Sequence, residues 1–194
     1  TVRGAELPPV PGFSVDAGSS EWQVVYEFCR YYGGIAPRFD RYGRLVIAPW
    51  PDGERRVLGA DAAVTRLTLR DQRYGVLSQV LVRDRTSQEV QTVTDSDFSA
   101  RGGRSRRVLT MPGKSSYQAM RYSGEYQLEQ ARKELRTLEL ELPAAFAAWP
   151  GGLGELRLAQ NVGTGLWRVR ESVSAQAEQG SYTRLTLAPP DVLG

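Results

Sequence analysis

Apolar and polar residues alternate along much of the chain after residue 60, and this pattern predicts antiparallel strands. Over Thr65–Arg70, leucine side chains face one way and arginine side chains the other. A period of two is typical of a strand with one buried face. Leu138–Leu142 repeats it, a short strand is expected at Leu156 and Leu158, and Trp167–Val169 should pair with Leu185–Leu187 across a long hairpin. These segments predict an antiparallel sheet or barrel.

Three further segments between residues 76 and 114 extend the strand pattern. Val76–Arg83 is partly apolar on both faces, which indicates a central strand, whereas the polar Glu89–Thr94 is typical of an edge. Phe98–Lys114 is rich in glycine and arginine and holds one short apolar run, Val108–Met111. We expect a loop flanking a strand there.

A first helix is predicted just after residue 19. Ser20 and Gln23 form a capping box at its start, and Gly33–Gly34 would end it. Its apolar face follows helical spacing through Trp22, Val25, Tyr26, Cys29 and Tyr32. Cys29, the single cysteine, is therefore interpreted as a small core residue.

A β-hairpin is predicted directly after this helix. Ile35–Phe39 and Leu45–Ala48 would pair across the turn Asp40–Gly43, whose glycine supplies the positive φ that such a loop needs. Because the helix has one apolar face, we expect it to pack on the hairpin. The two elements predict a small α+β unit.

A second helix is predicted over Ser123–Leu138. Its start signal is Ser123, and its apolar stripe consists of Leu128, Ala131, Leu135 and Leu138. A stripe this narrow is typical of a helix that lies on a sheet or barrel.

The expected fold class is α+β: an antiparallel β-barrel or sheet domain with one packed helix, plus a small helix–β-hairpin domain. The predicted boundaries are a Pro-rich linker or entry segment at 1–18, the helix–hairpin unit at 19–60, and a barrel-like domain at 61–190 that contains the helix at 123–138. The linker prediction rests on Leu7–Gly12, which reads Leu-Pro-Pro-Val-Pro-Gly. Because residue 1 is threonine rather than methionine, we expect a piece of a longer protein.

Nearly all of the positive charge in this chain is carried by arginine. The 194 residues include 25 basic and 22 acidic side chains, and the only lysines are Lys114 and Lys133. Seven of the arginines alternate with other residues along predicted strands, which is typical of a solvated sheet face: Arg66, Arg70, Arg83, Arg85, Arg168, Arg170 and Arg184. The densest cluster, Arg101–Arg107, is interpreted as a basic loop or subunit contact, because no aromatic residue is interleaved with it for base stacking. Apolar runs such as Ala144–Trp149 are too short to cross a bilayer. We therefore expect no specific nucleic-acid partner and no stable membrane insertion.

The side chains needed for common catalytic sites are missing. The chain has no histidine, which excludes Ser-His-Asp and Cys-His arrangements and most zinc sites. Glu139 and Glu141 share one face of a strand and could form an acid/base pair, but alternation with leucine favours a solvated sheet face. Asp95 and Asp97 lack the further oxygen ligands of a calcium loop. The sequence predicts no enzyme, no cofactor and no metal.

The order of motifs over Tyr74–Ala188 resembles the C-terminal part of tailed-phage tail and baseplate hub proteins, the late control gene D family with its Mu-like and prophage relatives. The motifs are Tyr74–Val82, the Ala-Arg-Lys-Glu-Leu run Ala131–Leu135, the Leu-rich strand with Pro150-Gly151, Gly165-x-Trp-x-Val169, and Gly180-x-x-Thr-x-Leu-x-Leu187. The helix–hairpin unit, Ser20–Ala48, is similar to the small domain that the family inserts ahead of its barrel. Two departures are that the family's upstream barrel is missing and that Val169–Ala175 lacks the histidine often found there.

The resemblance implies a structural role in assembly. A hub of this kind is a ring, a trimer in the full assembly, that joins the tail tube to a spike or tip protein. The implied location is the virion tail, assembled in the cytoplasm of a bacterial host. The arginines expected to make subunit contacts are Arg66, Arg70, Arg168 and Arg170.

Two alternatives to the hub stay open at this point. One is a carbohydrate- or surface-binding β module of a phage tip or adhesin. Trp50, between Pro49 and Pro51, is its candidate for ligand stacking. The other is a fragment of a cell-wall hydrolase, which the lack of histidine disfavours.

Overall fold

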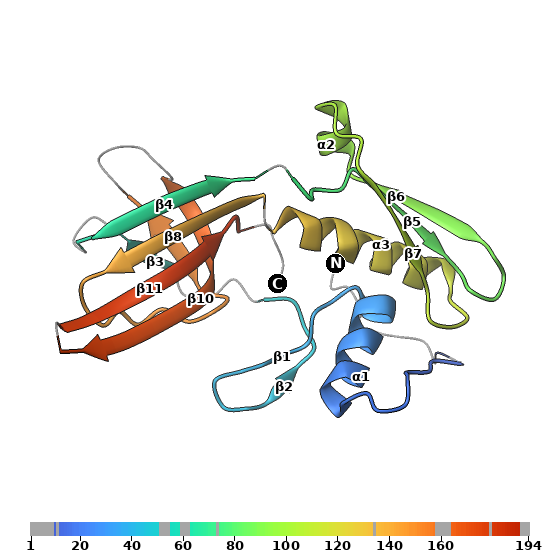
Figure 1. Ribbon diagram of the computed structural model, residues 1–194, viewed down its shortest axis with the longest axis horizontal. Coiled ribbons are helices and arrows are strands. Elements are labelled where there is room, and N and C mark those ends of the chain that lie inside the picture. Colours follow the sequence, from blue (N-terminus) through green and yellow to red (C-terminus); the bar gives the residue numbers. More distant parts are fainter. Residues whose placement is uncertain are drawn as a thin grey trace. The chain divides into compact units, whose positions relative to one another are not determined.

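A computed structural model shows two compact units, each built from two stretches of chain (Figure 1). It describes residues 10, 12–50, 55–58, 63–72, 74–133, 135–157, 164–178 and 180–190. The first unit combines Thr1–Pro49 with Gly75–Ala131, and the second combines Trp50–Tyr74 with Arg132–Gly194. These units do not coincide with the segments 19–60 and 61–190 expected from the sequence. Most of the Pro-rich entry segment lies outside the described residues, as does Leu158.

Helix α1, Glu21–Phe28, opens the described part of the first unit and continues into a π-helical turn, η1, Cys29–Gly33. The Ser20 hydroxyl oxygen accepts a hydrogen bond from the Gln23 backbone N–H at 3.2 Å, as its capping role requires. The Gln23 side chain turns forward to Glu27, at 3.2 Å, so the capping box is only half formed. Cys29 is buried, as predicted from its place on the apolar face.

Gly34 ends this helical segment in the left-handed conformation, with φ of 61°. A Cβ atom at this position would stand 2.7 Å from the Tyr122 carbonyl oxygen, so both the backbone conformation and the close approach favour glycine. The predicted hairpin follows as β1, Arg38–Phe39, and β2, Leu45–Val46. The Trp22 and Phe39 rings lie 5.1 Å apart, which places the helix against the hairpin.

A three-stranded sheet forms the rest of the β structure in this unit. It consists of β5, Gln79–Arg83, β6, Val90–Thr94, and β7, Arg106–Thr110, in the order β6-β5-β7. The central position of β5 and the edge position of β6 agree with the sequence pattern. A short helix, α2, Ser96–Ala100, was not expected; the Asp95 carboxylate caps it by accepting from the Phe98 N–H at 2.9 Å.

Helix α3 spans Tyr117–Arg132, so the predicted range Ser123–Leu138 is wrong at both ends. The Ser116 hydroxyl oxygen caps the true start by accepting from the Ala119 N–H at 3.2 Å. Ser123 is fully buried within the helix, while Leu135 and Leu138 belong to the following turn and strand.

The sheet on which α3 packs also differs from the prediction. Met120 and Leu128 share a core with Val80 and Val82 of the three-stranded sheet, in the first unit. Figure 1 shows α3 along one face of β5, β6 and β7. The helix therefore belongs to this smaller sheet and not to the barrel-like sheet expected to carry it.

The second unit is a curled six-stranded sheet with the order β3-β9-β10-β11-β8-β4. Only the β3–β9 pair is parallel. The expected hairpin is present, with Val169 opposite Leu187, and Leu140 lies opposite Leu185 on the next strand pair. The α+β class is thus as predicted. The strands are β3, Arg55–Leu58; β4, Arg66–Asp71; β8, Arg136–Leu142; β9, Leu153–Leu156; β10, Gly165–Ala177; and β11, Gly180–Ala188.

The core of this sheet is made by the apolar side of the alternating strands. Leu138, Leu140 and Leu142 are each at most 2% exposed, and they pack with Trp167, Val169, Leu185 and Leu187. Within the described residues, none of the helices is long and apolar enough to span a membrane.

Candidate functional site

The outer face of the six-stranded sheet carries a ladder of arginines and glutamates. We call this set, Arg66, Arg70, Glu139, Glu141 and Arg184, the charged ladder. Because the inner positions of β8 hold leucines, Glu139 and Glu141 must point to the other side. Strand β8 lies between β4 and β11, so each glutamate is flanked by residues of two strands. Glu141 stands directly opposite Arg66 on β4 and Arg184 on β11.

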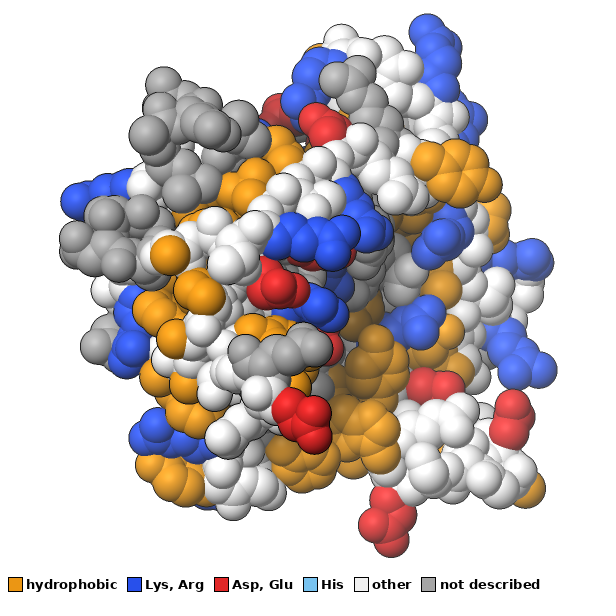
Figure 2. All heavy atoms as spheres, turned by 60° about the vertical axis from the view of Figure 1, so that its left-hand side comes forward, with side chains coloured by type: hydrophobic (Ala, Val, Ile, Leu, Met, Phe, Trp, Pro, Cys, Tyr) orange, Lys and Arg blue, Asp and Glu red, His pale blue; other side chains and the backbone are white. Residues whose placement is uncertain are grey.

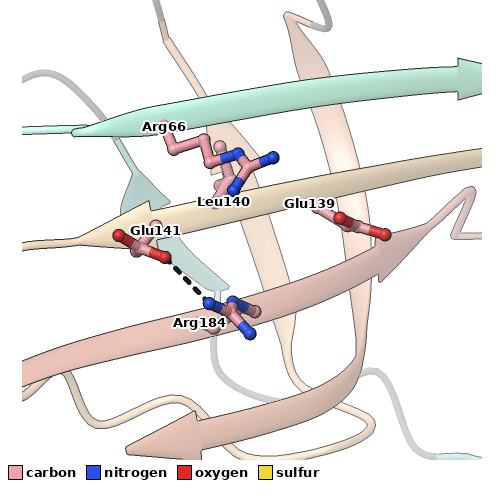
Figure 3. A pocket seen from close by; sticks show the side chains of 5 residues that line it. All are labelled: Arg66, Glu139, Leu140, Glu141 and Arg184. Carbon is pink, nitrogen blue, oxygen red and sulfur yellow. Dashed lines mark hydrogen bonds and ion pairs between the residues drawn. The ribbon is translucent and has the colours of Figure 1, made fainter.

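Two ion pairs connect neighbouring strands of the ladder. An Arg184 guanidinium nitrogen lies 3.1 Å from a Glu141 carboxylate oxygen (Figure 3). An Arg70 guanidinium nitrogen lies 3.3 Å from a Glu139 carboxylate oxygen. The side chains of both arginines are more than half exposed, at 52% and 62%. Exposed pairs of this kind contribute about 0–1 kcal/mol to stability. The ladder thus adds little to folding and leaves its arginines accessible to other molecules.

Arg66 borders a small hollow on this face. The hollow has a volume of about 140 Å³ and is lined by Arg66, Glu139, Leu140, Glu141 and Arg184. Figure 3 shows the Arg66 side chain reaching from β4 toward β8, with its guanidinium beside Leu140. Among the described residues, Arg66 makes no hydrogen bond or ion pair, whereas the nearby Glu141 carboxylate is paired with Arg184. Its guanidinium donors are therefore open to an external acceptor.

Arg168, a predicted contact residue, lies inside its own unit. It is 5% exposed, its Nε donates to the Pro190 carbonyl oxygen at 3.2 Å, and one Nη donates to the Gly151 carbonyl at 2.9 Å. Arg168 points to the opposite side of the strand from Trp167 and Val169, and the segments at Gly151 and Pro190 cover it there, so three successive residues, 167–169, are buried. Arg168 therefore links segments of its own unit by hydrogen bonds and is not available as a surface contact.

Arg170 occupies a β-bulge between Val169 and Glu171 and is exposed. One of its Nη atoms lies 3.5 Å from the Lys133 carbonyl oxygen, and it is not part of the charged ladder. Of the four predicted arginines, the fold therefore brings only Arg66 and Arg70 together.

Trp50, the candidate for ligand stacking, packs against its own unit. A Cβ atom at Gly151 would stand 1.9 Å from the indole Cε3, so the ring lies directly on that glycine. The half-buried indole has one face occupied in this way. Trp167 is 4% exposed within the core, whereas Trp149 is exposed.

Sequence reasoning did not single out two features of the surface. Arg184 belongs to the ladder, and the register of β11 with β8, which places it opposite Glu141, could have identified it. The hairpin β1–β2 and its turn expose Phe39, Tyr42, Leu45 and Ile47. This apolar exposure could not be predicted from the sequence, because alternation alone does not show which side of a short hairpin is covered.

The described residues offer no group of three or more histidine, cysteine, aspartate or glutamate side chains placed to hold a metal ion. Figure 2 shows Lys and Arg side chains spread over the face it draws, among acidic and apolar ones, rather than gathered in one patch. The charged ladder can pair with other charges and donate hydrogen bonds, which suits an interaction surface.

The fold is that of phage tail proteins, although comparison of sequences alone gives no match. No protein-family model matches the chain. No curated protein matches it either. The tail protein from Neisseria meningitidis MC58 superposes with a TM-score of 0.74 at 13% identity, over 93% of this chain and 58% of that one. The resemblance to tail proteins drawn from the sequence motifs is confirmed at the level of fold.

Two other solved structures share this fold. The 43 kDa tail protein of prophage MuSo2 from Shewanella oneidensis matches with a TM-score of 0.73 at 12% identity, over 94% of this chain and 58% of that one. A chain in the virion of a native gene transfer agent particle matches at 0.53 and 18% identity, over 86% and 38%. The present chain spans 58% of the length of each of the two tail proteins.

Proposed function

We propose that this chain is a structural component of a phage or phage-derived tail, in the hub at the baseplate or tail tip that joins the tail tube to a spike or tip protein. The observation that supports it most is the fold match over 93% of the chain to a tail protein. The same fold occurs in a chain of a virion particle. On this proposal the protein acts by assembly and not by catalysis, as part of the virion tail.

The mechanism of such a protein is the burial of complementary surfaces. A ring requires a contact between two different patches of neighbouring subunits, arranged so that the rotation closes. Charged side chains at such a contact set register and partner choice more than affinity. Arg66, Arg70 and Arg170 are exposed and remain our candidates for subunit contacts. Arg168 is withdrawn from that set because it is buried.

The test is the mass of the protein in solution, expressed together with whatever flanks this chain in its gene. Native mass spectrometry and light scattering should give a defined ring, a trimer on our proposal. Particles from the producing bacterium should contain the protein in a fixed ratio to the tail tube subunit. A monomer at all accessible concentrations that is also absent from purified particles would contradict the proposal.

A further inference from the structure

Three of the edge strands of the two larger sheets carry a pair of arginines. Strands β3, β4, β6 and β7 are the edges of the six-stranded and three-stranded sheets. Three of them carry two arginines each: Arg55 and Arg56, Arg66 and Arg70, and Arg106 and Arg107. The glutamates of the described strands lie on the inner strands β8, β9 and β10. Arginines also occur on inner strands, among them Arg136 and Arg184, and β4 ends in Asp71, but none of these edge strands carries a glutamate.

An unpaired edge is a template for another strand, and side chains on the edge decide which strand fits. Opposite charges directly across a strand pair contribute roughly 0.2–1 kcal/mol, and like charges are destabilising by comparable amounts. The inner neighbour of β4 already follows this rule, since β8 places Glu141 opposite Arg66. A strand that adds to the other side of β4 meets the same row of Arg66, Thr68 and Arg70.

A second copy of this chain fits that edge poorly. Antiparallel pairing of two β4 strands centred on Thr68 would set Arg66 opposite the partner subunit's Arg70, and the reverse, on the same face. Strands β3 and β7 of a second copy would also bring arginines. A strand that matches β4 must instead carry carboxylates, which the other described edge, β6, Val90–Thr94, also lacks.

Among the three basic edges, β4 is distinguished by the hollow that Arg66 borders together with Arg184. Arg107 on β7 donates to the Gln127 side-chain oxygen at 3.2 Å, and on β3 Arg55 acts on the neighbouring Glu155, helping to lower its pKa after the larger effect of Arg157. Arg66, in contrast, makes no hydrogen bond or ion pair to another described residue and borders the hollow that also exposes Arg184. Arg70 keeps 62% of its side chain exposed despite its pair with Glu139.

We propose that the β4 edge receives an extended acidic segment of a different protein, which adds to the six-stranded sheet as a further strand. Its carboxylates pair with Arg66 and Arg70, and backbone hydrogen bonds hold the strand. This inference rests on the proposed tail role, which supplies neighbouring proteins as partners. The competing explanation is that the edge arginines act only to prevent edge-to-edge association of sheets.

The test uses the full chain and a labelled ten-residue peptide that alternates glutamate with threonine or valine, with a lysine peptide of the same pattern as its control. Fluorescence anisotropy should show binding of the glutamate peptide only, weakening as salt is raised. The variant Arg66→Glu/Arg70→Glu should bind it about tenfold more weakly, from the sum of lost and reversed charge pairs, and should gain binding of the lysine peptide. The matched variant Arg85→Glu/Arg104→Glu, which reverses two exposed arginines of the other unit, should bind as the wild type does.

A second readout separates strand addition from loose ionic attraction. Hydrogen exchange of the β4 amides should slow when the glutamate peptide binds, while the β6 amides should not change. A second variant, Arg66→Gln/Arg70→Gln, removes the charges but keeps polar side chains, and it is used if charge reversal prevents folding. It should also weaken binding of the glutamate peptide. Equal binding of both peptides, or self-association of the glutamine variant with no peptide binding by the wild type, would overturn the proposal. If the Arg66 and Arg70 variants lose peptide binding and still assemble into a normal ring, that result would support the acidic strand partner separately from the proposed hub role.

Discussion

The carboxylate of Asp84 accepts a hydrogen bond from the backbone N–H of Ser115 at 2.6 Å, joining the end of β5 to the segment that leads into α3. The other carboxylate oxygen accepts from the N–H groups of Thr86 and Ser87, each at 2.7 Å. Asp84 is 1% exposed. One buried side chain therefore fixes both a turn and a connection across the first unit.

Replacing Asp84 by asparagine should destabilise the first unit by about 1–3 kcal/mol. Only one of the two oxygens remains, and the amide NH2 would face a backbone donor. Urea unfolding at pH 7, followed by far-UV circular dichroism, measures the loss. Asp97→Asn, at an exposed position of α2, is the control and should stay within about 0.5 kcal/mol.

The stability of the same unit should fall in acid because of Asp84. Burial alone would raise the pKa of this carboxyl, but hydrogen bonds from Ser87, Ser115 and Thr86 outweigh it and lower the pKa below its ordinary value. A depressed folded-state pKa stabilises the protein above the unfolded pKa of about 3.9, and this stabilisation is lost as pH falls through the folded value. The difference in unfolding free energy between wild type and Asp84→Asn should therefore shrink below pH 4. A difference that stays constant from pH 7 to pH 2 would contradict this account.

Replacing Gly124 by alanine should destabilise the protein, although alanine is about 1 kcal/mol more favourable than glycine inside a helix. A Cβ atom there would stand 2.5 Å from a Val93 methyl carbon, and overpacking of a core costs about 1–3 kcal/mol. Thermal unfolding compares the wild type with Gly124→Ala. Adding Val93→Ala to that variant should recover part of the loss, because it removes the clashing methyl groups; purely additive effects would argue against the contact.

Thr183 gives a physical role to the threonine of the Gly-x-x-Thr-x-Leu motif. It is fully buried; its hydroxyl accepts from the Phe146 N–H at 2.9 Å and donates to the Ala144 carbonyl at 3.0 Å. Thr183→Val keeps the shape but leaves both backbone groups unsatisfied, so we expect a loss of about 1–3 kcal/mol in denaturant unfolding. Thr183→Ser, which retains the hydroxyl, should lose clearly less.

Arg168 and Arg170 are neighbours in sequence but should respond very differently to substitution. Arg168→Met removes buried hydrogen bonds to two carbonyl groups and should destabilise the second unit by about 1.5–3 kcal/mol. Arg170→Met, at an exposed bulge, should stay within about 0.5 kcal/mol. Equal melting temperatures of the two variants would show that the burial of Arg168 has no consequence.

Strands were the part of the fold that sequence could predict, because burial of one sheet face forces a period of two. This holds for β4, β8, β10 and β11. It failed at Arg168, which alternation places on the exposed side but which lies under Gly151 and Pro190; contacts between segments so distant in the chain leave no sign in a single sequence.

The second helix was misplaced for a related reason. Its first half, from Tyr117 to Gly124, holds tyrosine, serine and glycine, which have modest helix propensity, and packing overrides that preference. Leu135 and Leu138 continue the spacing of Leu128 and Ala131 by coincidence, since they follow the helix. Pairing of strands distant in sequence, and thus the charged ladder, could be anticipated only once the register of β4, β8 and β11 was known.

The division of the chain between two units also bears on its synthesis. Strand β4 ends at Asp71, but its partner β8 begins only at Arg136, after Gly75–Ala131 has supplied much of the other unit. A ribosome adds about 5–20 residues per second, so β4 waits roughly 3–13 s for its partner. During that time both of its edges are unpaired, and Arg66 and Arg70 keep the nascent segment charged and hydrated. The six-stranded sheet can therefore be completed only late in synthesis, after much of the first unit has been made.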